Sequence, residues 1–270
     1  MSAFVNHFSF QFRTGVRNRS LLLLNYLFPL VFYVMMGLIM PQINSAFLET
    51  MIPALVVFAI MVATLLGLPD PLVTAREAGI FRSYKINGVP AFSILVIPAL
   101  TTVLHAVVVG SIITFTAPMF FDAPTPVNWS AFILTFLLTA FAFAGLGVLI
   151  GVISPSSQMT VLWSQLVFIP AMLLSGVSGL PYSMLPEAMG KIAQLLPATH
   201  AMNAFRGLAQ DLTPDFDPQG SLVILALSGV LAFGLAIYLF NWDRHNATQR
   251  GHPLLALLVL LPYVVGVFLL

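Results

Sequence analysis

The chain has 270 residues, of which 59% are hydrophobic and 7% are charged, and its mean hydropathy is +1.00. A soluble domain of this length does not need so much apolar material to fill its core, so the composition excludes a soluble globular protein. The net charge of +1 by itself indicates no class of partner. We expect no nucleic-acid partner. The chain contains no cysteine, which excludes disulfides and thiolate metal sites.

Long apolar runs predict an all-α integral membrane protein. About 20 apolar residues cross the hydrocarbon layer as a helix, whereas barrel strands would alternate polar and apolar residues over about ten positions, a pattern that this sequence lacks. The run at 21–40 is too long for the core of a cleaved signal peptide, so we expect it to remain as the first helix. The predicted spans are 21–40, 51–69, 91–120, 129–153, 159–179 and 221–241.

The positions of the charged residues predict the orientation. With a cytoplasmic N-terminus, eight of the ten Lys and Arg residues fall on the inner side: Arg13, Arg17, Arg19, Arg76, Arg82, Lys85, Arg244 and Arg250. The outer side then keeps Lys191 and Arg206 together with most of the acidic residues. Because basic residues mark cytoplasmic segments, we expect a multi-pass protein of the inner (cytoplasmic) cell membrane with its N-terminus inside.

The first 17 residues precede the spans and place Phe4, Phe8 and Phe12 four positions apart. This spacing predicts an amphipathic helix that lies on the inner leaflet. A frayed tail is the alternative interpretation.

Residues 180–210 lie between the last two spans. They contain three prolines and only short apolar stretches, each too short to cross the membrane. We expect short re-entrant helices in the outer leaflet, because irregular backbone at that depth must be packed against protein.

The charged stretch "TAREAGIFRSYKINGVP" connects the second and third spans. Thr74 and Glu77 have the spacing of a capping box, which predicts a helix that begins there. Asn87-Gly88 and Pro90 end it, which gives about 12 residues and about 18 Å. We expect Phe81 and Tyr84 to be an exposed aromatic pair on the apolar face of this helix.

Such a helix offers apolar residues ringed by charge to a partner protein. The simpler alternative is that any cytoplasmic loop collects Arg and Lys, but that would not require a capped helix.

In this stretch the sequence resembles the permease subunits of type-2 ATP-binding-cassette (ABC) transporters. Glu77, Gly79 and Pro90 match the cytoplasmic helix of that family, and Pro197 and Arg206 in "LLPATHAMNAFRGL" match a segment before its last span. The resemblance covers about residues 1–242, which we interpret as the permease domain. Residues 243–270 then form a cytoplasmic linker and an extra hydrophobic segment.

The resemblance implies a dimeric transmembrane domain whose short helix is a coupling helix, docked in a cleft of a separate ABC ATPase subunit. The implied docking residues are Arg76, Glu77, Gly79, Ile80, Phe81, Arg82, Tyr84 and Lys85. The chain has no G-x-x-x-x-G-K-[ST] loop, so ATP and Mg²⁺ belong to that partner and we expect no cofactor here.

Few ionisable residues lie within the predicted spans, and this scarcity argues against ion-coupled transport. His105 is one, and a neutral imidazole bonded to a neighbouring helix explains it. Uncharged polar and aromatic side chains suggest a path for an amphipathic or lipid-like substrate, although bonds between helices explain the amides equally well. The candidates are Asn25, Phe28, Gln158 and Gln165.

Small residues four apart lie in the fourth and fifth predicted helices, as Gly147 with Gly151 and Ser175 with Gly179. Close packing within one chain is the default interpretation, and the fifth-helix pair is also a candidate for a dimer seam. The run at 254–270 has 17 uncharged residues, about 26 Å as a helix, which just suffices for a seventh span; the alternative is a hairpin that lies in the membrane.

The sequence therefore favours the membrane subunit of an ABC exporter that works as a homodimer or with a similar chain in a lipid membrane. One alternative is a non-catalytic scaffold or insertase with the same docking helix. An intramembrane enzyme is another alternative, but the five histidines lie far apart without acidic partners.

Overall fold

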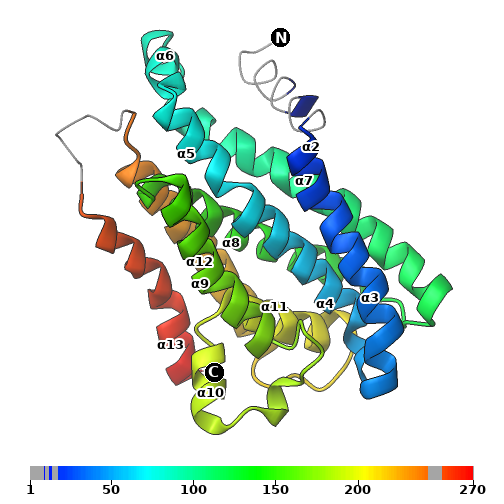
Figure 1. The fold of residues 1–270 in the computed structure, drawn as a ribbon. Coiled ribbons are helices and arrows are strands. Elements are labelled where there is room, and N and C mark those ends of the chain that lie inside the picture. Colours follow the sequence, from blue (N-terminus) through cyan, green and yellow to red (C-terminus); the bar gives the residue numbers. More distant parts are fainter. Residues whose placement is uncertain (1–8, 10–11, 14–17, 243–250, 270) are drawn as a thin grey trace.

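The computed structural model describes residues 9, 12–13, 18–242 and 251–269. All regular elements within these ranges are helices. Figure 1 shows long helices packed side by side, with α6 (Ile80–Ile86) at one end of the bundle and α10 (Glu187–Ala193) at the other. We call these the α6 end and the α10 end. The predicted interfacial helix at residues 1–17 lies almost entirely outside the described residues.

Among the described residues, six helical segments are long and apolar enough to cross a membrane, as predicted. Two contain a π-helical turn: α2 (Arg19–Leu22), η1 (Leu23–Leu27) and α3 (Phe28–Ile43) form the first, and α4 (Phe47–Met61), η2 (Val62–Gly67) and α5 (Pro69–Glu77) form the second. The others are α7 (Ala91–Phe121), α8 (Trp129–Ile153), α9 (Ser157–Leu174) and α12 (Pro218–Leu239). The all-α membrane bundle is confirmed.

The second segment is the core of the bundle. Its most apolar window is 94% buried, and helices α3, α7, α8 and α11 (Pro197–Ala204) pack around α4. The residues of α4 are apolar on all sides, which is the pattern of a helix buried within a larger bundle. Met51, Leu55 and Phe58 are each at most 1% exposed.

Small residues let α8 approach this core helix closely. A Cβ atom on Gly147 would clash with the carbonyl oxygen of Thr64, and one on Gly151 would lie 3.0 Å from the carbonyl oxygen of Pro69. The predicted packing of this glycine pair within one chain is confirmed.

The segment between the second and third spans differs from the prediction. Thr74 does not begin a helix, because α5 starts at Pro69 and continues the second span to Glu77. A proline in the first turn of a helix is compatible with helical geometry, so Pro69 and Pro71 do not prevent the formation of α5. A break at Gly79, with φ of 73°, then separates α5 from α6, which has seven residues instead of about 12.

The fifth span is shorter than predicted. Helix α9 ends at Leu174, and the chain then turns through Gly176 and Gly179, which have φ of 89° and 84°. Ser175 and Gly179 therefore do not share a helix face. Gly179 instead packs tightly against Met40 and Phe47 of the same chain. The structure removes the basis for a dimer seam at this pair.

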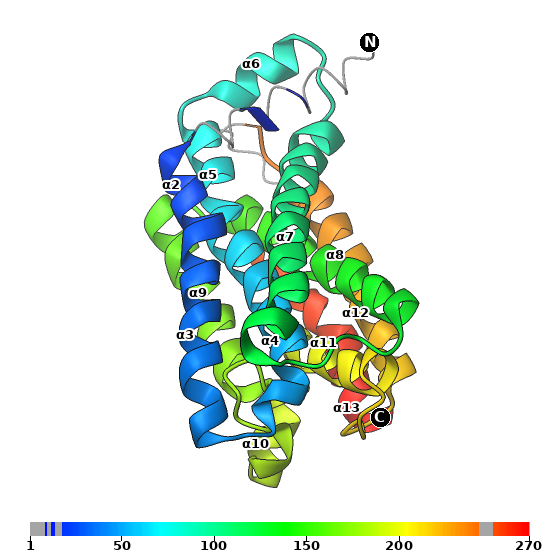
Figure 2. The same cartoon turned by 90° about the vertical axis from the view of Figure 1, so that its right-hand side faces the viewer.

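Short helices fill residues 182–209, as expected. They are η3 (Tyr182–Met184), α10, α11 and η4 (Phe205–Ala209). Every residue of α11 is buried, because this helix packs against α4, α8, α9 and α12. Figure 2 shows α10 and α11 at the end opposite α6.

The C-terminal apolar run forms η5 (Pro253–Leu260) and α13 (Leu261–Leu269), which run antiparallel to α12. The Tyr263 hydroxyl donates a hydrogen bond to Ser228 Oγ of α12 at 2.6 Å. Because a 3₁₀ helix rises about 2.0 Å per residue, these 17 residues reach about 30 Å, against about 26 Å for an α-helix. The 3₁₀ turn thus lets a short segment run along most of the bundle.

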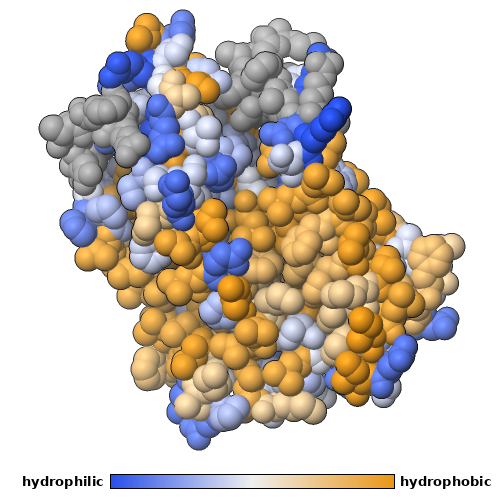
Figure 3. Space-filling model, viewed as in Figure 1, coloured by the Kyte–Doolittle hydropathy of each residue, from blue (hydrophilic) through white to orange (hydrophobic). Residues whose placement is uncertain are grey.

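Apolar side chains cover the middle of the surface. On the face seen in Figure 3, hydrophobic residues form a broad belt across the long helices, with hydrophilic residues towards the α6 and α10 ends. Exposed apolar side chains in this belt include Val31, Leu162 and Val230, at 57%, 61% and 63% exposure. This belt is the surface that a bilayer would cover.

Candidate functional site

Helix α6 projects beyond the long helices at its end of the bundle (Figure 2). Gly79 and Gly88 flank it with φ of 73° and 72°, a left-handed conformation that glycine adopts without steric cost. The helix is fixed by Phe81, which is 4% exposed and lies 5.5 Å, between ring centroids, from Phe240 after α12. The expectation that Phe81 is exposed is therefore wrong, and this ring anchors the helix.

The exposed side of α6 has a different composition from the one expected. Ile80 is 43% exposed and Ile86 is 80% exposed. Glu77, Arg82 and Lys85 are also exposed, while Tyr84 is half-buried. The outer surface of this short helix is thus two isoleucines among charged residues, which suits contact with another protein.

Arg76 of α5 lies below α6 and holds the turn between α8 and α9. Its guanidinium donates a hydrogen bond to the carbonyl oxygen of Val152 at 2.8 Å and another to that of Ser154. These carbonyls are at the C-terminal end of α8, where a cation is favourable for the helix dipole. Arg76 therefore couples the segment that carries α6 to the start of α9.

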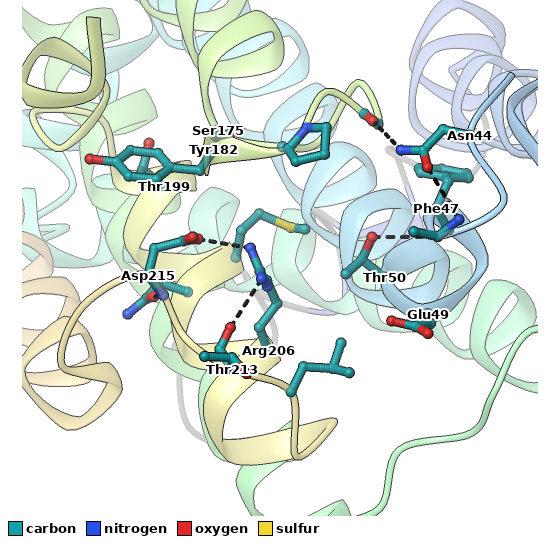
Figure 4. Close-up of a pocket in the computed structure, with 17 residues that line it drawn as sticks. Asn44, Phe47, Glu49, Thr50, Ser175, Tyr182, Thr199, Arg206, Thr213 and Asp215 are labelled. Atoms are coloured by element: carbon teal, nitrogen blue, oxygen red, sulfur yellow. Dashed lines mark hydrogen bonds and ion pairs between the residues drawn. The ribbon is translucent and has the colours of Figure 1, made fainter. Parts of the chain in front are cut away.

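A polar pocket of about 290 Å³ lies at the α10 end. Figure 4 shows the Arg206 side chain between Asp215 and Thr213, with Glu49 of α4 on the opposite wall. Arg206 Nη1 donates to Asp215 Oδ2 at 2.8 Å, and Nη2 donates to the Thr213 carbonyl at 3.0 Å. This ion pair ties η4 to the loop that leads into α12.

Internal hydrogen bonds occupy most polar groups around this pocket. Asn203 Oδ1 accepts from the backbone amides of Asp215 and Phe216, and its Nδ2 donates to Ser221 Oγ at 3.1 Å. Burial raises the pKa of the Asp215 carboxyl, against the opposing effect of Arg206. These contacts make the pocket wall a stiff scaffold between the short helices and α12.

The ABC-2 type transporter family model matches residues 4–209. No individual curated protein matches the chain. The match covers more than half of the 270 residues and includes α6, most of the residues that line the polar pocket and, among the described residues, five of the six long apolar segments. The chain belongs to the ABC-2 type transporter family.

This ABC-2 permease subunit is a multi-pass membrane protein, as its apolar helices and its family both show. The match ends before α12, so α12, η5 and α13 lie outside it. In the part of the permease that the structure describes, no cluster of three or more His, Cys, Asp or Glu side chains could hold a metal ion.

The four candidate path residues of the permease lie in two places. Asn25 is 6% exposed and points at η2, where a Cβ atom on Gly67 would lie 2.7 Å from its Oδ1. Phe28 is 43% exposed and lies 5.6 Å from the Phe58 ring. Gln158 is exposed and Gln165 is half-buried on α9. The structure does not bring these four side chains into one cavity.

His105 of α7 bonds to a neighbouring helix, as predicted. Its Nδ1 lies 2.6 Å from the Tyr26 hydroxyl of η1, and the Phe12 ring stacks on the imidazole at 5.2 Å. This histidine is a packing residue between the first and third long segments.

Sequence reasoning missed two features of the site. Ile86 was not a candidate because it falls next to the Asn-Gly turn, although its place at the last residue of a short exposed helix was a usable signal. Asn203 was missed because its partners come from the loop after Gln210 and from α12. No local pattern indicates such contacts.

Proposed function

We propose that this ABC-2 permease moves an amphipathic or lipid-like substrate out of the cytoplasm, driven by a separate ATPase subunit docked on α6. The observation that carries the proposal is the short helix α6, anchored by Phe81 and presenting Ile80, Ile86 and charged residues beyond the bundle. A rigid, partly apolar projection at one end of a membrane bundle suits transmission of motion from a soluble partner.

Charge supports a cytoplasmic α6 end. Arg19, Arg76, Arg82 and Lys85 lie at this end, whereas Glu49, Asp122, Glu187, Asp211, Asp215 and Asp217 lie at the other. Basic residues favour the cytoplasmic side, so the N-terminus would be inside. Since the chain has no cysteine, a single cysteine at Lys85 or at Ser183 is a unique reporter. We expect an impermeant thiol reagent to label Ser183→Cys in intact cells and not Lys85→Cys.

Co-purification tests the docking assignment. We expect an ATPase subunit to co-purify with the unaltered permease and its recovery to fall at least about tenfold in Ile86→Asp or Glu77→Lys, because these alter the exposed surface of α6 and of the end of α5 beside it. Ile43→Asp is the matched control, since Ile43 is 73% exposed at the opposite end of the bundle. Equal recovery of the ATPase with all variants would show that it docks elsewhere.

The apolar faces of α3 and α9 support a homodimer. The most apolar windows of the first and fifth long segments are only 28% and 22% buried within the chain. A second copy could cover these faces, with lipid covering whatever stays exposed. Cross-linking single cysteines at Val34 and Leu166 tests this: dimeric products support it, and their absence at both positions contradicts it.

The substrate proposal follows from the scarcity of charge along the long helices. The candidate path residues are amides and an aromatic ring, and ion-coupled transport would require buried acidic groups. Candidate lipids and drugs can be compared by their stimulation of ATP hydrolysis in the assembled complex. A complex that responds only to small inorganic ions would contradict an amphipathic substrate.

A further inference from the structure

Two π-helical turns contact each other in the first two long segments. η1 interrupts the first segment and η2 the second. Each is followed by a proline in the first turn of the next helix, Pro29 in α3 and Pro69 in α5. Proline has no N–H and its ring crowds the carbonyl four residues before it, so a wider turn there relieves the crowding. In η1 the Phe28 N–H accordingly donates to the carbonyl of Leu23, five residues back.

Asn25 of η1 lies where these turns meet, and its side chain is not satisfied. The residue is 6% exposed, and its Oδ1 has no hydrogen-bond partner among the described residues. It is aimed at Gly67 of η2, where a Cβ atom would lie 2.7 Å from Oδ1. A buried amide without a hydrogen bond is costly, because the bonds to water that it made in the unfolded chain are not replaced. Gly67 therefore leaves room for an amide that is held in an unfavourable state.

The backbone of Gly67 offers this amide a partner. Pro71 follows four residues later and has no N–H, so the Gly67 carbonyl lacks the donor that an α-helix would supply. Rotation of the Asn25 amide about its last side-chain bond exchanges Oδ1 with Nδ2, which is a donor. A rotated amide would thus direct a donor at the residue that now faces its unpaired oxygen.

Of the two turns, η1 has more freedom to adjust. The second segment is held by α8, which approaches the backbone of Thr64 and Pro69 through its glycine pair. Its most apolar window is 94% buried, against 28% for the first segment. A π-helical turn differs from an α-helical one by a shift of one residue in its hydrogen bonds, so η1 can rearrange locally without unfolding the helix.

We propose that Asn25 is a positioning residue that switches between two conformations. In the one shown, which predominates, Oδ1 faces Gly67 without a bond. In the second, the amide is rotated, Nδ2 donates to the Gly67 carbonyl, and η1 adjusts. Because η1 joins the α6 end to α3, the switch changes how the first two segments meet. Its use in transport rests on the proposed docking of an ATPase on α6, whereas the switch itself belongs to the permease alone.

Fluorine NMR of the full-length permease in nanodiscs tests the switch. Since the chain has no cysteine, a trifluoromethyl thiol reagent labels a single cysteine placed at Leu23, the first residue of η1, which is 56% exposed. We expect a main and a minor resonance. The same label at Val230 of α12, which is 63% exposed, is the control position and should give one resonance.

Two variants should shift the populations in opposite directions. Asn25→Leu keeps the branched shape and removes the donor, so the minor resonance should fall about tenfold, the change expected from one hydrogen bond. Its melting temperature should rise, because the unpaired amide is gone. Gly67→Ala places a Cβ atom against Oδ1 and should make the second resonance the larger one. Gln165→Leu and Gly234→Ala are the matched controls, since a Cβ atom on Gly234 meets nothing within 4 Å.

Two results would overturn the proposal. One resonance at the same position in the unaltered chain and in both variants would mean that Asn25 is held in a single orientation. Two resonances whose populations neither variant changes would place the exchange elsewhere in the chain.

The assembled complex tests the use of the switch separately. Asn25→Leu should leave the recovery of the ATPase subunit unchanged and lower its rate of ATP hydrolysis. An unchanged rate would contradict the use of the switch in transport. If no ATPase is recovered with the unaltered permease, the docking proposal fails, and the resonances still decide whether Asn25 switches.

Discussion

Some polar side chains inside this permease are paired across helices. Tyr33 of α3 lies 2.9 Å from Thr116 Oγ1 of α7, and Tyr263 donates to Ser228 of α12. Unpaired polar groups in an apolar surrounding are costly, so such pairs fix the relative position of the helices. The sequence indicates that His105 needs a partner, but the identity of that partner depends on which helices meet.

His200 of α11 is a buried titratable residue outside the long helices. It is 1% exposed, its Nε2 donates to the Gln194 carbonyl at 2.8 Å, and Phe216 and Tyr263 lie beside the ring. Burial lowers the pKa of His200 to about 4, against the weaker raising effect of that hydrogen bond. The imidazole is therefore neutral at physiological pH.

This shift predicts acid sensitivity. Between pH 6.5 and about 4 the unfolded chain protonates His200 and the folded chain does not, so the stability present above pH 6.5 is lost as the pH falls to about 4. At about 1.4 kcal/mol per pKa unit, the loss is on the order of 3 kcal/mol. His200→Gln keeps a donor and does not titrate, so its melting temperature should fall less between pH 7.5 and 4.5. Equal falls in both proteins would contradict this assignment.

At the scale of elements, hydropathy predicted six long helices, and local turn signals predicted where several of them end. The helix start at Thr74 was wrong because the capping-box pattern also fits the last turn of a helix that arrives from the membrane. The fifth helix was predicted to end five residues too late, since apolar and small residues continue past Leu174 into a turn built on two glycines. Backbone breaks of this kind depend on packing with α3 and α4.

The break at Gly79 sets the direction of α6. Nothing lies within 4 Å of a Cβ atom built there, so the constraint is the backbone conformation alone. In Gly79→Ala, a left-handed residue with a side chain costs about 1–2 kcal/mol, which favours a continuous helix from α5 into α6. Gly79→Asn should keep the break, because asparagine tolerates this conformation.

A spin-label distance between cysteines at Arg19 and Lys85 measures this change. We expect one narrow distance distribution in the unaltered chain and in Gly79→Asn, and a shifted or broadened one in Gly79→Ala. An unchanged distribution in Gly79→Ala would show that the Phe81 contact with Phe240 alone directs α6.

For the whole molecule, composition indicated the class and two short motifs indicated the family, which the family match confirmed. The arrangement around the buried α4 could not be predicted, because nearly every helix is apolar on all sides and pattern alone does not show which one is central. The C-terminal segment was an open question for the same reason, and its 3₁₀ turn has no clear local signal.

The packing of that segment predicts that it stabilises the α10 end. Deleting residues 252–270 removes the Tyr263 ring from His200 and the contact of Gly266 with Ile224. We expect the deletion to lower the melting temperature. It should also accelerate hydrogen exchange more in α11 than in α5. Tyr263→Phe, which removes only the hydroxyl, should show a smaller effect of about 1–2 kcal/mol. Unchanged exchange in α11 after the deletion would show that α12 alone holds this helix.

Because η5 and α13 extend along the bundle, they also limit how an ATPase domain could be joined to this permease. In the described part of the chain, six long segments and the shorter η5–α13 segment run along the bundle, so Leu269 and Arg19 lie at opposite ends of it. A domain fused after Leu269 would emerge on the side away from α6. An ATPase could reach α6 as a domain fused upstream of Arg19 or as an independent polypeptide.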